Sequence, residues 1–263
     1  MFPLAGSSPP NQPDELTRAL ADGLRACGLT SRSVQTDGAW PELTRLAIDL
    51  TGAEATLATP VPVANEQIGA GPRLAAFELD AAPLHFEAIP VHLRVRLASA
   101  ATEFARAAEG ALALALASAA SGEIDLHIFH ADLEAGLHTL VAGLAKKHGA
   151  DVKSTRLEIT APTARSLALQ ITATAKAFIV TTTVKVRGRV ELDDQLNARC
   201  TGLVAEGEGM LGSMVESALR PRLAQFEGRT FALGAFVAGG LRLRDVSVRV
   251  DDALRLHATL EGA

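Results

Sequence analysis

Histidine and acidic side chains gather near the middle of the chain, where His127, His130 and Asp132 are followed by Glu134 and His138. Imidazole and carboxylate groups at short spacing are the ligands that a zinc ion uses. Residues three apart on a strand point to opposite faces, however, so His127 and His130 should diverge. Glu134 and His138 share a helix face at i, i+4, which is also the spacing of an ordinary solvated pair. We therefore expect no metal site here.

Residues 207–212 form a glycine string, Gly-x-Gly-x-x-Gly, that matches the phosphate-binding turn of dinucleotide-binding folds. That turn requires an acidic residue about 20 positions further on. Residues 230–240 contain no acid, and Glu206 and Glu208 would repel a pyrophosphate at a helix N-terminus. The chain also contains no Gly-x-Ser-x-Gly, P-loop or His-Glu-x-x-His sequence. We expect no cofactor and no catalytic residue, although distant side chains could still assemble a hydrolase site.

The composition argues against a nucleic-acid partner. Aromatic residues make up 4% of the chain, with one Trp and no Tyr, and the net charge is -5. Base stacking needs exposed aromatic rings, and phosphate binding needs positive charge. The two cysteines, Cys27 and Cys200, lie far apart and are expected to be free thiols rather than a disulfide.

Three helices are predicted to position the apolar side chains. The first follows Pro13 and places Leu16, Leu20 and Leu24 on one face, with Gly28 at its end. The second runs over 132–148, and the third runs over 208–226, where Pro221 should kink it or end it early. The apolar positions of the last two helices are Leu133, Leu137, Leu140, Val141, Leu144, Leu211, Met214, Val215, Ala218, Leu219, Leu223 and Phe226.

Between the helices the apolar period changes from 3.6 to 2, which predicts strands. Residues 91–97, 165–177 and 180–192 alternate in this way, and so do the C-terminal segments near 241–250 and 253–260. Residues 111–130 read as a hairpin that turns at Ser121-Gly122. The strands over 165–192 are long, since thirteen residues at ~3.3 Å each span roughly 40 Å.

The order of elements predicts an α+β fold dominated by antiparallel strands. Residues 1–12 are rich in Pro, Ser and Gly and are expected to be a flexible arm. Residues 13–263 are expected to form a single domain, with a weak internal repeat between 156–171 and 248–256.

The segment 132–226 resembles the tubular lipid-binding (TULIP) superfamily, including small bacterial lipid-binding proteins of the LmeA type. Asp132-Leu133 opens a helix, the strands over 157–192 follow, and a second helix opens near Met210. The resemblance implies a long, strongly curved antiparallel sheet wrapped around or packed on two to three amphipathic helices. It also implies non-enzymatic binding or transport of a lipid or fatty-acid-like molecule, with transient membrane contact.

The expected ligand-binding residues are the aliphatic side chains on the facing stripes of the two later helices. They are Leu137, Val141, Leu144, Leu211, Met214 and Val215. Two alternatives predict other interiors: a structural or interaction protein has a closed core, and a hydrolase has a cleft with clustered ionisable groups. No signal peptide or transmembrane run is visible, so we expect a cytoplasmic location as written, or an exported one if a leader has been trimmed.

Overall fold

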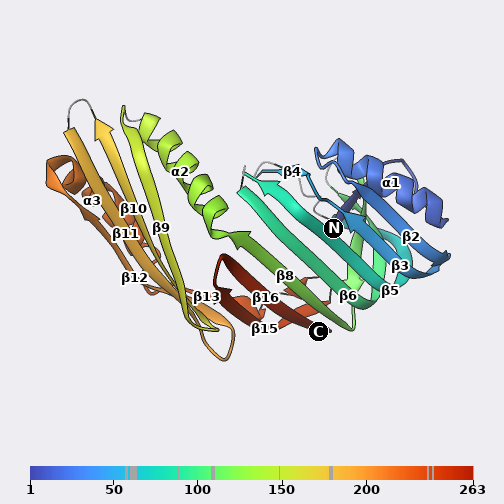
Figure 1. Cartoon of the computed structure of the whole chain (residues 1–263). Coiled ribbons are helices and arrows are strands. Elements are labelled where there is room, and N and C mark those ends of the chain that lie inside the picture. The colour runs from blue at the N-terminus through green and yellow to red at the C-terminus, as the bar shows by residue number, and fades with distance from the viewer. Residues whose placement is uncertain are drawn as a thin grey trace. The chain divides into compact units, whose positions relative to one another are not determined.

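The chain divides into two compact units in the computed structural model (Figure 1). Unit 1 comprises Met1–His127, Ala235–Asp245 and Leu256–Ala263, and unit 2 comprises Ile128–Gly234 and Val246–Arg255. The contacts thus divide the segment 13–263, for which we expect a single domain, between two compact units. The structure describes residues 1–56, 59, 64–87, 89–107, 110–147, 149–177, 180–235, 237–238 and 240–262. Among these, strands dominate and three α-helices occur, which confirms the α+β class.

Unit 1 is built mainly on one large mixed sheet. Its elements are β1 (Phe2–Leu4), α1 (Pro13–Ala26), β2 (Ser33–Ala39), β3 (Glu42–Asp49), β4 (Glu54–Ala55), β5 (Ala64–Phe86), β6 (Ile89–Ala107), β7 (Leu112–Ser118), β8 (Ser121–Phe129), β14 (Val237–Ala238), β15 (Leu241–Val250) and β16 (Ala253–Gly262). The strand order is β14-β15-β16-β8-β6-β5-β3-β2. Three of these strands, β8, β15 and β16, pass from one unit into the other.

The expectation of an antiparallel sheet holds only in part for unit 1, whose sheet is mixed. Strands β3 and β4 pair with β5 in parallel, with Leu43 opposite Leu74 and Ile48 opposite Leu79. A parallel pair needs a long connection, and the chain between β3 and the paired half of β5 supplies it. Alternation of polar and apolar residues predicts strands but does not fix the direction of their partners.

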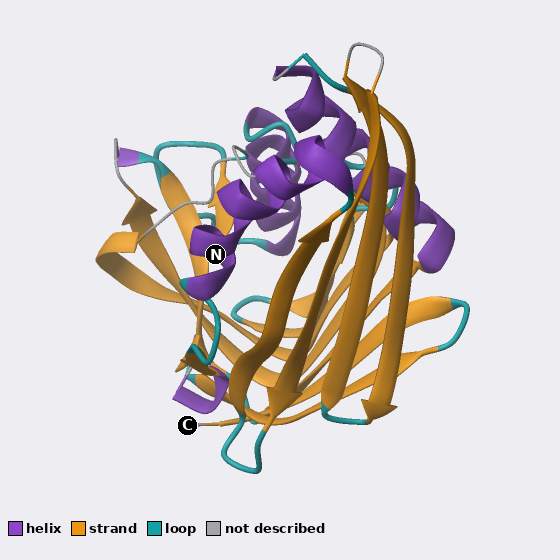
Figure 2. Cartoon of the chain, turned by 90° about the vertical axis from the view of Figure 1, so that its left-hand side faces the viewer, coloured by secondary structure: helices purple, strands orange, loops and turns teal. Residues whose placement is uncertain are grey.

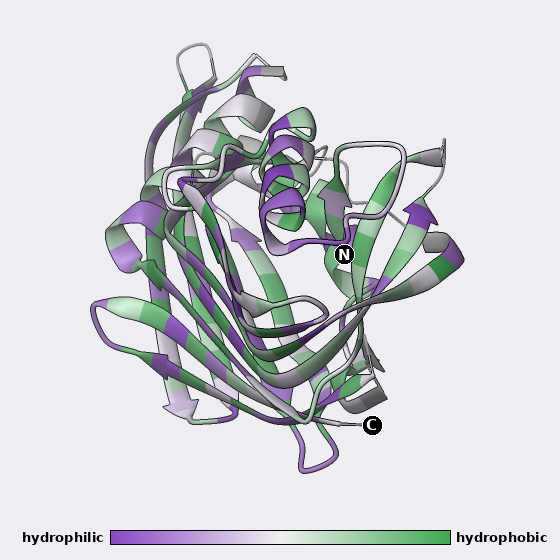
Figure 3. Cartoon of the chain, turned by 90° about the vertical axis from the view of Figure 1, so that its right-hand side faces the viewer, coloured by the Kyte–Doolittle hydropathy of each residue, from purple (hydrophilic) through white to green (hydrophobic). Residues whose placement is uncertain are grey.

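Helix α1 forms as predicted and covers the core of unit 1. Leu16 and Leu20 are 0% exposed and Leu24 is 2% exposed, because residues four apart fall on one helix face. They pack with Leu46 and Ile48 of β3 in the same apolar cluster. Gly28 follows with φ of +82°, a conformation that suits glycine at a helix end. Figure 3 shows the alternation of hydrophilic and hydrophobic residues along the strands beneath.

The N-terminal segment is not only an arm. Phe2, Pro3 and Leu4 pair with Leu114, Ala113 and Leu112 of β7, so they extend the sheet. Leu4 is 5% exposed, and the ring of Phe2 lies 5.4 Å from that of Phe77. The Pro, Ser and Gly content of 1–12 predicts a flexible arm, but burial of its few apolar residues decides the local structure.

The predicted hairpin over 111–130 is also wrong. Strands β7 and β8 do not pair with each other; both pair with β6, at residues 101–106 and 92–98 respectively. They lie one after the other along β6, which is long enough to hold both. Gly122 is not a turn residue, because it lies within β8 opposite Leu97 of β6. A Cβ at this position would lie 2.5 Å from Leu97 and 3.2 Å from Leu260. Its small size serves close packing rather than chain reversal.

Unit 2 contains a five-stranded sheet in which every pair of neighbours is antiparallel. Its elements are α2 (His130–Lys147), β9 (Asp151–Thr163), β10 (Ser166–Ala177), β11 (Val180–Leu192), β12 (Asn197–Gly207), α3 (Gly209–Ala224) and β13 (Thr230–Ala232). The strand order is β13-β12-β11-β10-β9. Figure 2 shows the long strands side by side. Helix α3 includes Pro221 and continues for three residues beyond it, so the proline does not end the helix there.

Candidate functional site

The sheet of unit 2 has one aliphatic face. Leu167, Leu169 and Ile171 of β10 alternate with residues that point the other way, and Val190 and Val186 of β11 lie opposite Leu167 and Ile171. We call this surface the apolar face. Its central residues are Leu167, Leu169, Ile171, Val184, Val186 and Val190. Every one of them is half-buried and none is fully buried.

Aliphatic side chains in the core of unit 1 are much less exposed to solvent than those of the apolar face. Leu43 and Leu46 of β3 are 2% and 0% exposed, and Ile48 is 1% exposed. Within the described ranges of the chain, the largest fully buried side chains all lie in unit 1: Leu16, Leu20, Leu24, Leu43, Leu46, Ile48, Leu114 and Pro72. The aliphatic residues of the apolar face are therefore less completely covered than those of the unit 1 core.

Helix α2 lies along β9, the edge strand of the sheet. The carboxylate of Glu134 accepts a hydrogen bond from the backbone N–H of Leu157 at 2.7 Å. The Nε2 atom of His130 lies 2.8 Å from the carbonyl oxygen of Leu157. The Nδ1 atom of His138 forms a hydrogen bond of 3.1 Å with the hydroxyl of Thr155. These side chains occupy polar groups that a free edge strand would leave for another chain.

Helix α3 protects the opposite part of the sheet in the same way. Glu216 accepts the backbone N–H of Gly207 at 3.2 Å. After the helix, Glu227 accepts the N–H groups of Gly202 and Leu203 at 3.0 and 2.7 Å. Thus carboxylates bind backbone amides of both β9 and β12, while β10 and β11 lie between these two strands.

The glycine string at 207–212 has a packing role in the structure. A Cβ on Gly207 would lie 2.0 Å from the carbonyl oxygen of Gly212, so only glycine permits this approach of α3 to β12. Between them, Gly209 takes a φ of +71° at the start of the helix. Thr182 donates a hydrogen bond to the carbonyl of Glu208 at 2.7 Å and fixes the same turn.

The expected ligand-binding residues fall into three groups. Leu137 and Val141 are half-buried on α2. Met214 is 64% exposed and Val215 is 42% exposed on α3, so both side chains are accessible to solvent. The side chains of Leu144 and Leu211 lie outside the part of the chain that the structure describes.

The histidines of the central segment separate as expected. The rings of His127 and His92 are stacked, with centroids 4.3 Å apart and planes at 18°, whereas His130 binds the backbone of β9. On the same side of β8 as His127, Asp125 lies 2.7 Å from Nδ1 of His257. Among the described residues, no group of three or more His, Cys, Asp or Glu side chains could hold a metal ion. The sequence gives no sign of the His92–His127 contact, because the two residues lie on different strands.

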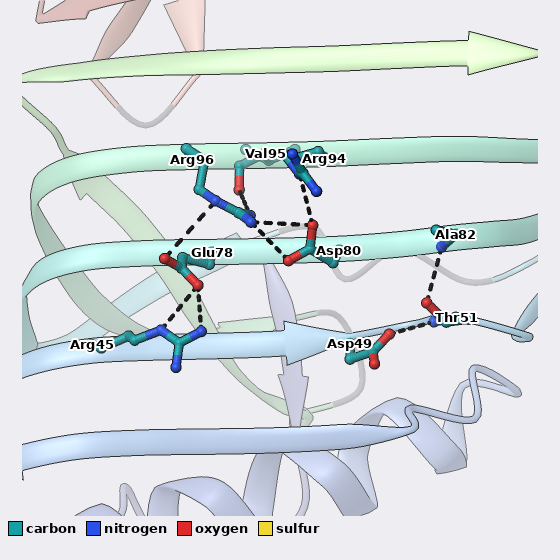
Figure 4. Close-up of polar contacts among 9 residues, drawn as sticks. All are labelled: Arg45, Asp49, Thr51, Glu78, Asp80, Ala82, Arg94, Val95 and Arg96. Atoms are coloured by element: carbon teal, nitrogen blue, oxygen red, sulfur yellow. Dashed lines mark hydrogen bonds and ion pairs between the residues drawn. The ribbon is translucent and has the colours of Figure 1, made fainter.

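A network of ion pairs crosses the polar side of the unit 1 sheet (Figure 4). Glu78 on β5 accepts hydrogen bonds from Arg45 on β3, and Arg96 on β6 lies 3.9 Å from it. Arg96 and Arg94 both donate to Asp80, Arg96 at 2.9 Å to Oδ2. Opposite charges alternate across these neighbouring strands, so the network reads as cross-strand stabilisation rather than a reactive cluster.

Comparison of the chain with protein-family models, with curated proteins and with solved structures gives no match. No relative therefore assigns a role to a residue of either unit. Among the described residues, no helix is long and apolar enough to cross a membrane. The apolar face of unit 2 and the helices beside it are the candidate site.

Proposed function

We propose that unit 2 binds a lipid-like apolar molecule on the apolar face, without catalysing a reaction. The observation that carries this proposal is that all six central residues of the face, from Leu167 to Val190, are half-buried. Aliphatic side chains gathered on one face and only half-buried leave apolar surface that a ligand can cover, and such surface often marks a binding site. The TULIP-like architecture, with the sheet curved around its helices and its ligand, is part of this proposal.

The chemistry of the face suits an acyl chain. Its side chains are aliphatic, with no charge and no aromatic ring among Leu167, Leu169, Ile171, Val184, Val186 and Val190. Each methylene that leaves water contributes about 0.8 kcal/mol, so a long chain gains useful affinity from burial alone. Strand β10 has 12 residues and, at ~3.3 Å per residue, offers a path of roughly 40 Å.

The edges of the sheet explain why the ligand would lie on the face. Glu134 occupies an amide of β9, and Glu216 and Glu227 occupy amides of β12. A peptide strand therefore meets occupied amides at these points of the sheet, whereas the aliphatic surface over β10 and β11 remains accessible. Leu137 and Val141 of α2 are proposed to border this surface beside β9.

The first test is to isolate the protein under native conditions and identify any co-purifying lipid by native mass spectrometry and organic extraction. After delipidation, a fluorescent fatty acid should bind to the wild type. Ile171→Thr keeps a β-branched residue but places a hydroxyl on the apolar face. We expect it to weaken probe binding about tenfold, since a loss of about 1.4 kcal/mol corresponds to that factor.

The matched control is Thr172→Ala, one position along β10 on the other side of the sheet. It should bind the probe like the wild type, because its side chain points away from the apolar face. If the delipidated wild type binds no probe, or if both variants weaken binding equally, the carrier proposal should be abandoned. The interaction-module alternative would then be favoured.

A further inference from the structure

Helix α3 carries no charged side chain on the side that faces away from the sheet. Gly212 is buried, and Glu216, Leu219 and Leu223 are half-buried; their spacing of four, three and four residues defines the side toward the sheet. The opposite side we call the outer face of α3. It consists of Met210, Ser213, Met214, Ser217, Ala218 and Pro221, all of them exposed and none of them charged.

The exposure of the two methionines is unusual. Met210 is 81% exposed and Met214 is 64% exposed, although a surface helix normally places charged or polar side chains on its solvent side. Methionine is flexible and polarisable and suits a surface that must accept partners of varied shape. Phe226, just after the helix, is 43% exposed and adds a further apolar side chain to this region of the chain.

Several arginine side chains lie beside the outer face or just after α3. Arg220 and Arg222 flank it and are exposed. Arg229 lies over the rings of Phe226 and Phe231, 5.9 and 5.1 Å from their centroids. Among the described residues, Arg222 and Arg229 have no ion-pair partner.

Glu216 in α3 and Glu227 after it bind backbone amides of β12. Glu216 binds the N–H of Gly207, and Glu227 binds the N–H groups of Gly202 and Leu203. The other carboxylate oxygen of Glu216 pairs with Arg220. Although the whole chain has a net charge of -5, the outer face of α3 itself carries no charged side chain, and Arg222 and Arg229 supply unpaired positive charge among the described residues of this segment. Exposed apolar side chains beside unpaired arginines suit the surface of an anionic membrane, which attracts basic residues.

We propose that the outer face of α3 docks onto the surface of a membrane that contains anionic phospholipid. The methionines enter the boundary between head groups and acyl chains, and Arg222 and Arg229 contact lipid phosphates. This inference goes beyond ligand binding on the apolar face, because it uses residues on the opposite side of α3. A protein carrying both surfaces would receive its lipid while resting on the membrane.

The test is flotation of the purified full chain with vesicles. Vesicles of equal parts phosphatidylcholine and phosphatidylglycerol should carry the protein, and vesicles of phosphatidylcholine alone should carry much less. Met210→Ser/Met214→Ser should reduce flotation about tenfold, because it removes the two apolar side chains. Arg222→Gln/Arg229→Gln should reduce it by about 25-fold at low salt, since each arginine contributes about fivefold at an anionic surface.

Matched controls lie in unit 1. Phe86→Ser removes another exposed apolar side chain, and Arg18→Gln/Arg32→Gln removes two other exposed arginines. Both control proteins should float like the wild type. Wild-type protein that does not float with anionic vesicles, or a methionine variant that floats like the wild type, would overturn the proposal.

Two further measurements separate the remaining outcomes. The methionine variant should keep its far-ultraviolet circular dichroism and its binding of the fluorescent fatty acid, so that loss of flotation alone reports docking. Failure of flotation with intact probe binding would refute docking and leave the carrier proposal standing. If sedimentation velocity shows a wild-type dimer that the methionine variant lacks, the outer face belongs to a second copy of the chain, and the docking proposal is wrong.

Discussion

Asp80 is the residue at which the charges of unit 1 converge. Partial burial raises the pKa of its carboxyl group, but hydrogen bonds and charge from Arg96 and Arg94 outweigh this effect and hold the pKa below its ordinary value of 3.8. Arg96 also lies 3.9 Å from Glu78, so one guanidinium links two carboxylates of β5. Such a network orders three neighbouring strands even where each exposed pair contributes only ~0–1 kcal/mol.

Arg96→Gln should remove this bridge and let the pKa of Asp80 rise toward 3.8. A carboxyl group whose folded pKa is depressed stabilises the fold above its unfolded pKa and loses this contribution as the pH falls through the folded value. The variant should therefore be less stable than the wild type at pH 7, and the difference should shrink below pH 3.8. Carboxyl NMR titration and urea unfolding at both pH values measure the two effects.

Arg18→Gln on α1 serves as the control for this change, because Arg18 is exposed and stands outside the network. It should leave both the titration of Asp80 and the pH dependence of stability unchanged. A difference between Arg96→Gln and the wild type that stays constant from neutral to acid pH would mean that the Asp80 carboxylate is not responsible.

At the scale of elements, the helices of unit 2 both bind the sheet through carboxylates that accept backbone N–H groups. Glu134 of α2 binds Leu157 of β9, and Glu216 of α3 binds Gly207 of β12. A carboxylate is an effective acceptor because a charged partner makes the stronger hydrogen bond. These contacts fix where each helix lies along its strand and occupy edge amides that would otherwise pair with another chain.

Glu134→Ala should destabilise unit 2 by about 1–3 kcal/mol, because it leaves the N–H of Leu157 without its acceptor. Glu134→Gln keeps an acceptor oxygen but loses the charge, so its cost should be smaller. Amide hydrogen exchange at Leu157 should accelerate in the alanine variant first. Urea unfolding followed by far-ultraviolet circular dichroism measures the loss of stability.

Glu158→Ala is the control on the same strand, since Glu158 is exposed on the other side of the sheet. Its effect should stay within about 0.5 kcal/mol. If the two alanine variants lose the same stability, the hydrogen bond of Glu134 does not hold α2 on β9.

The elements that the sequence predicts well are those whose signal is local. The helical spacing of Leu16, Leu20 and Leu24 predicts α1, and the alternation over 165–192 predicts β10 and β11. Partners distant in the chain leave no such signal. The parallel pairing of β3 with β5, the end-to-end course of β7 and β8 along β6, and the binding of Leu157 by Glu134 all depend on tertiary contacts.

The candidate site was predictable only in part for the same reason. The apolar alternation of β10 is visible in the sequence, but the half-burial of Ile171 and Val186 is not, because exposure depends on what the rest of the unit covers. The apolar residues of α3 do not show which side of the helix faces the sheet. Met214 and Leu219 are both apolar, yet Met214 is 64% exposed and Leu219 is half-buried, so hydropathy alone does not identify the inward side.

At the scale of the whole molecule, the two units differ in how completely they bury their apolar side chains. Among the residues that the structure describes, the largest fully buried side chains all lie in unit 1, whereas the central strands of unit 2 have a half-buried aliphatic face. Burial of apolar area is the main favourable contribution to folding, so unit 1 should be the more stable unit. The proposed binding surface would lower the stability of unit 2, because its apolar side chains stay partly in contact with water without a ligand.

The single tryptophan makes this difference measurable. Trp40 lies in unit 1, stacked on Phe104 with ring centroids 6.4 Å apart, and the chain contains no tyrosine. Tryptophan fluorescence should therefore follow unit 1 alone, while far-ultraviolet circular dichroism follows the strands of both units. In urea we expect the dichroism to begin changing at a lower concentration than the fluorescence, because unit 2 opens first.

The fluorescent fatty acid, or an unlabelled one in the fluorescence experiment, should shift the two signals unequally. A ligand that binds only the folded form stabilises it by RT ln(1 + [L]/Kd), about 2.7 kcal/mol at a hundredfold excess over Kd. The early change in dichroism should therefore move to higher urea, while the tryptophan transition stays in place until the two coincide. Ile171→Thr should show a smaller shift at the same ligand concentration, because its Kd is higher. Coincident transitions without ligand would mean that the units unfold together, and a ligand shift confined to the tryptophan signal would place the binding site in unit 1 instead.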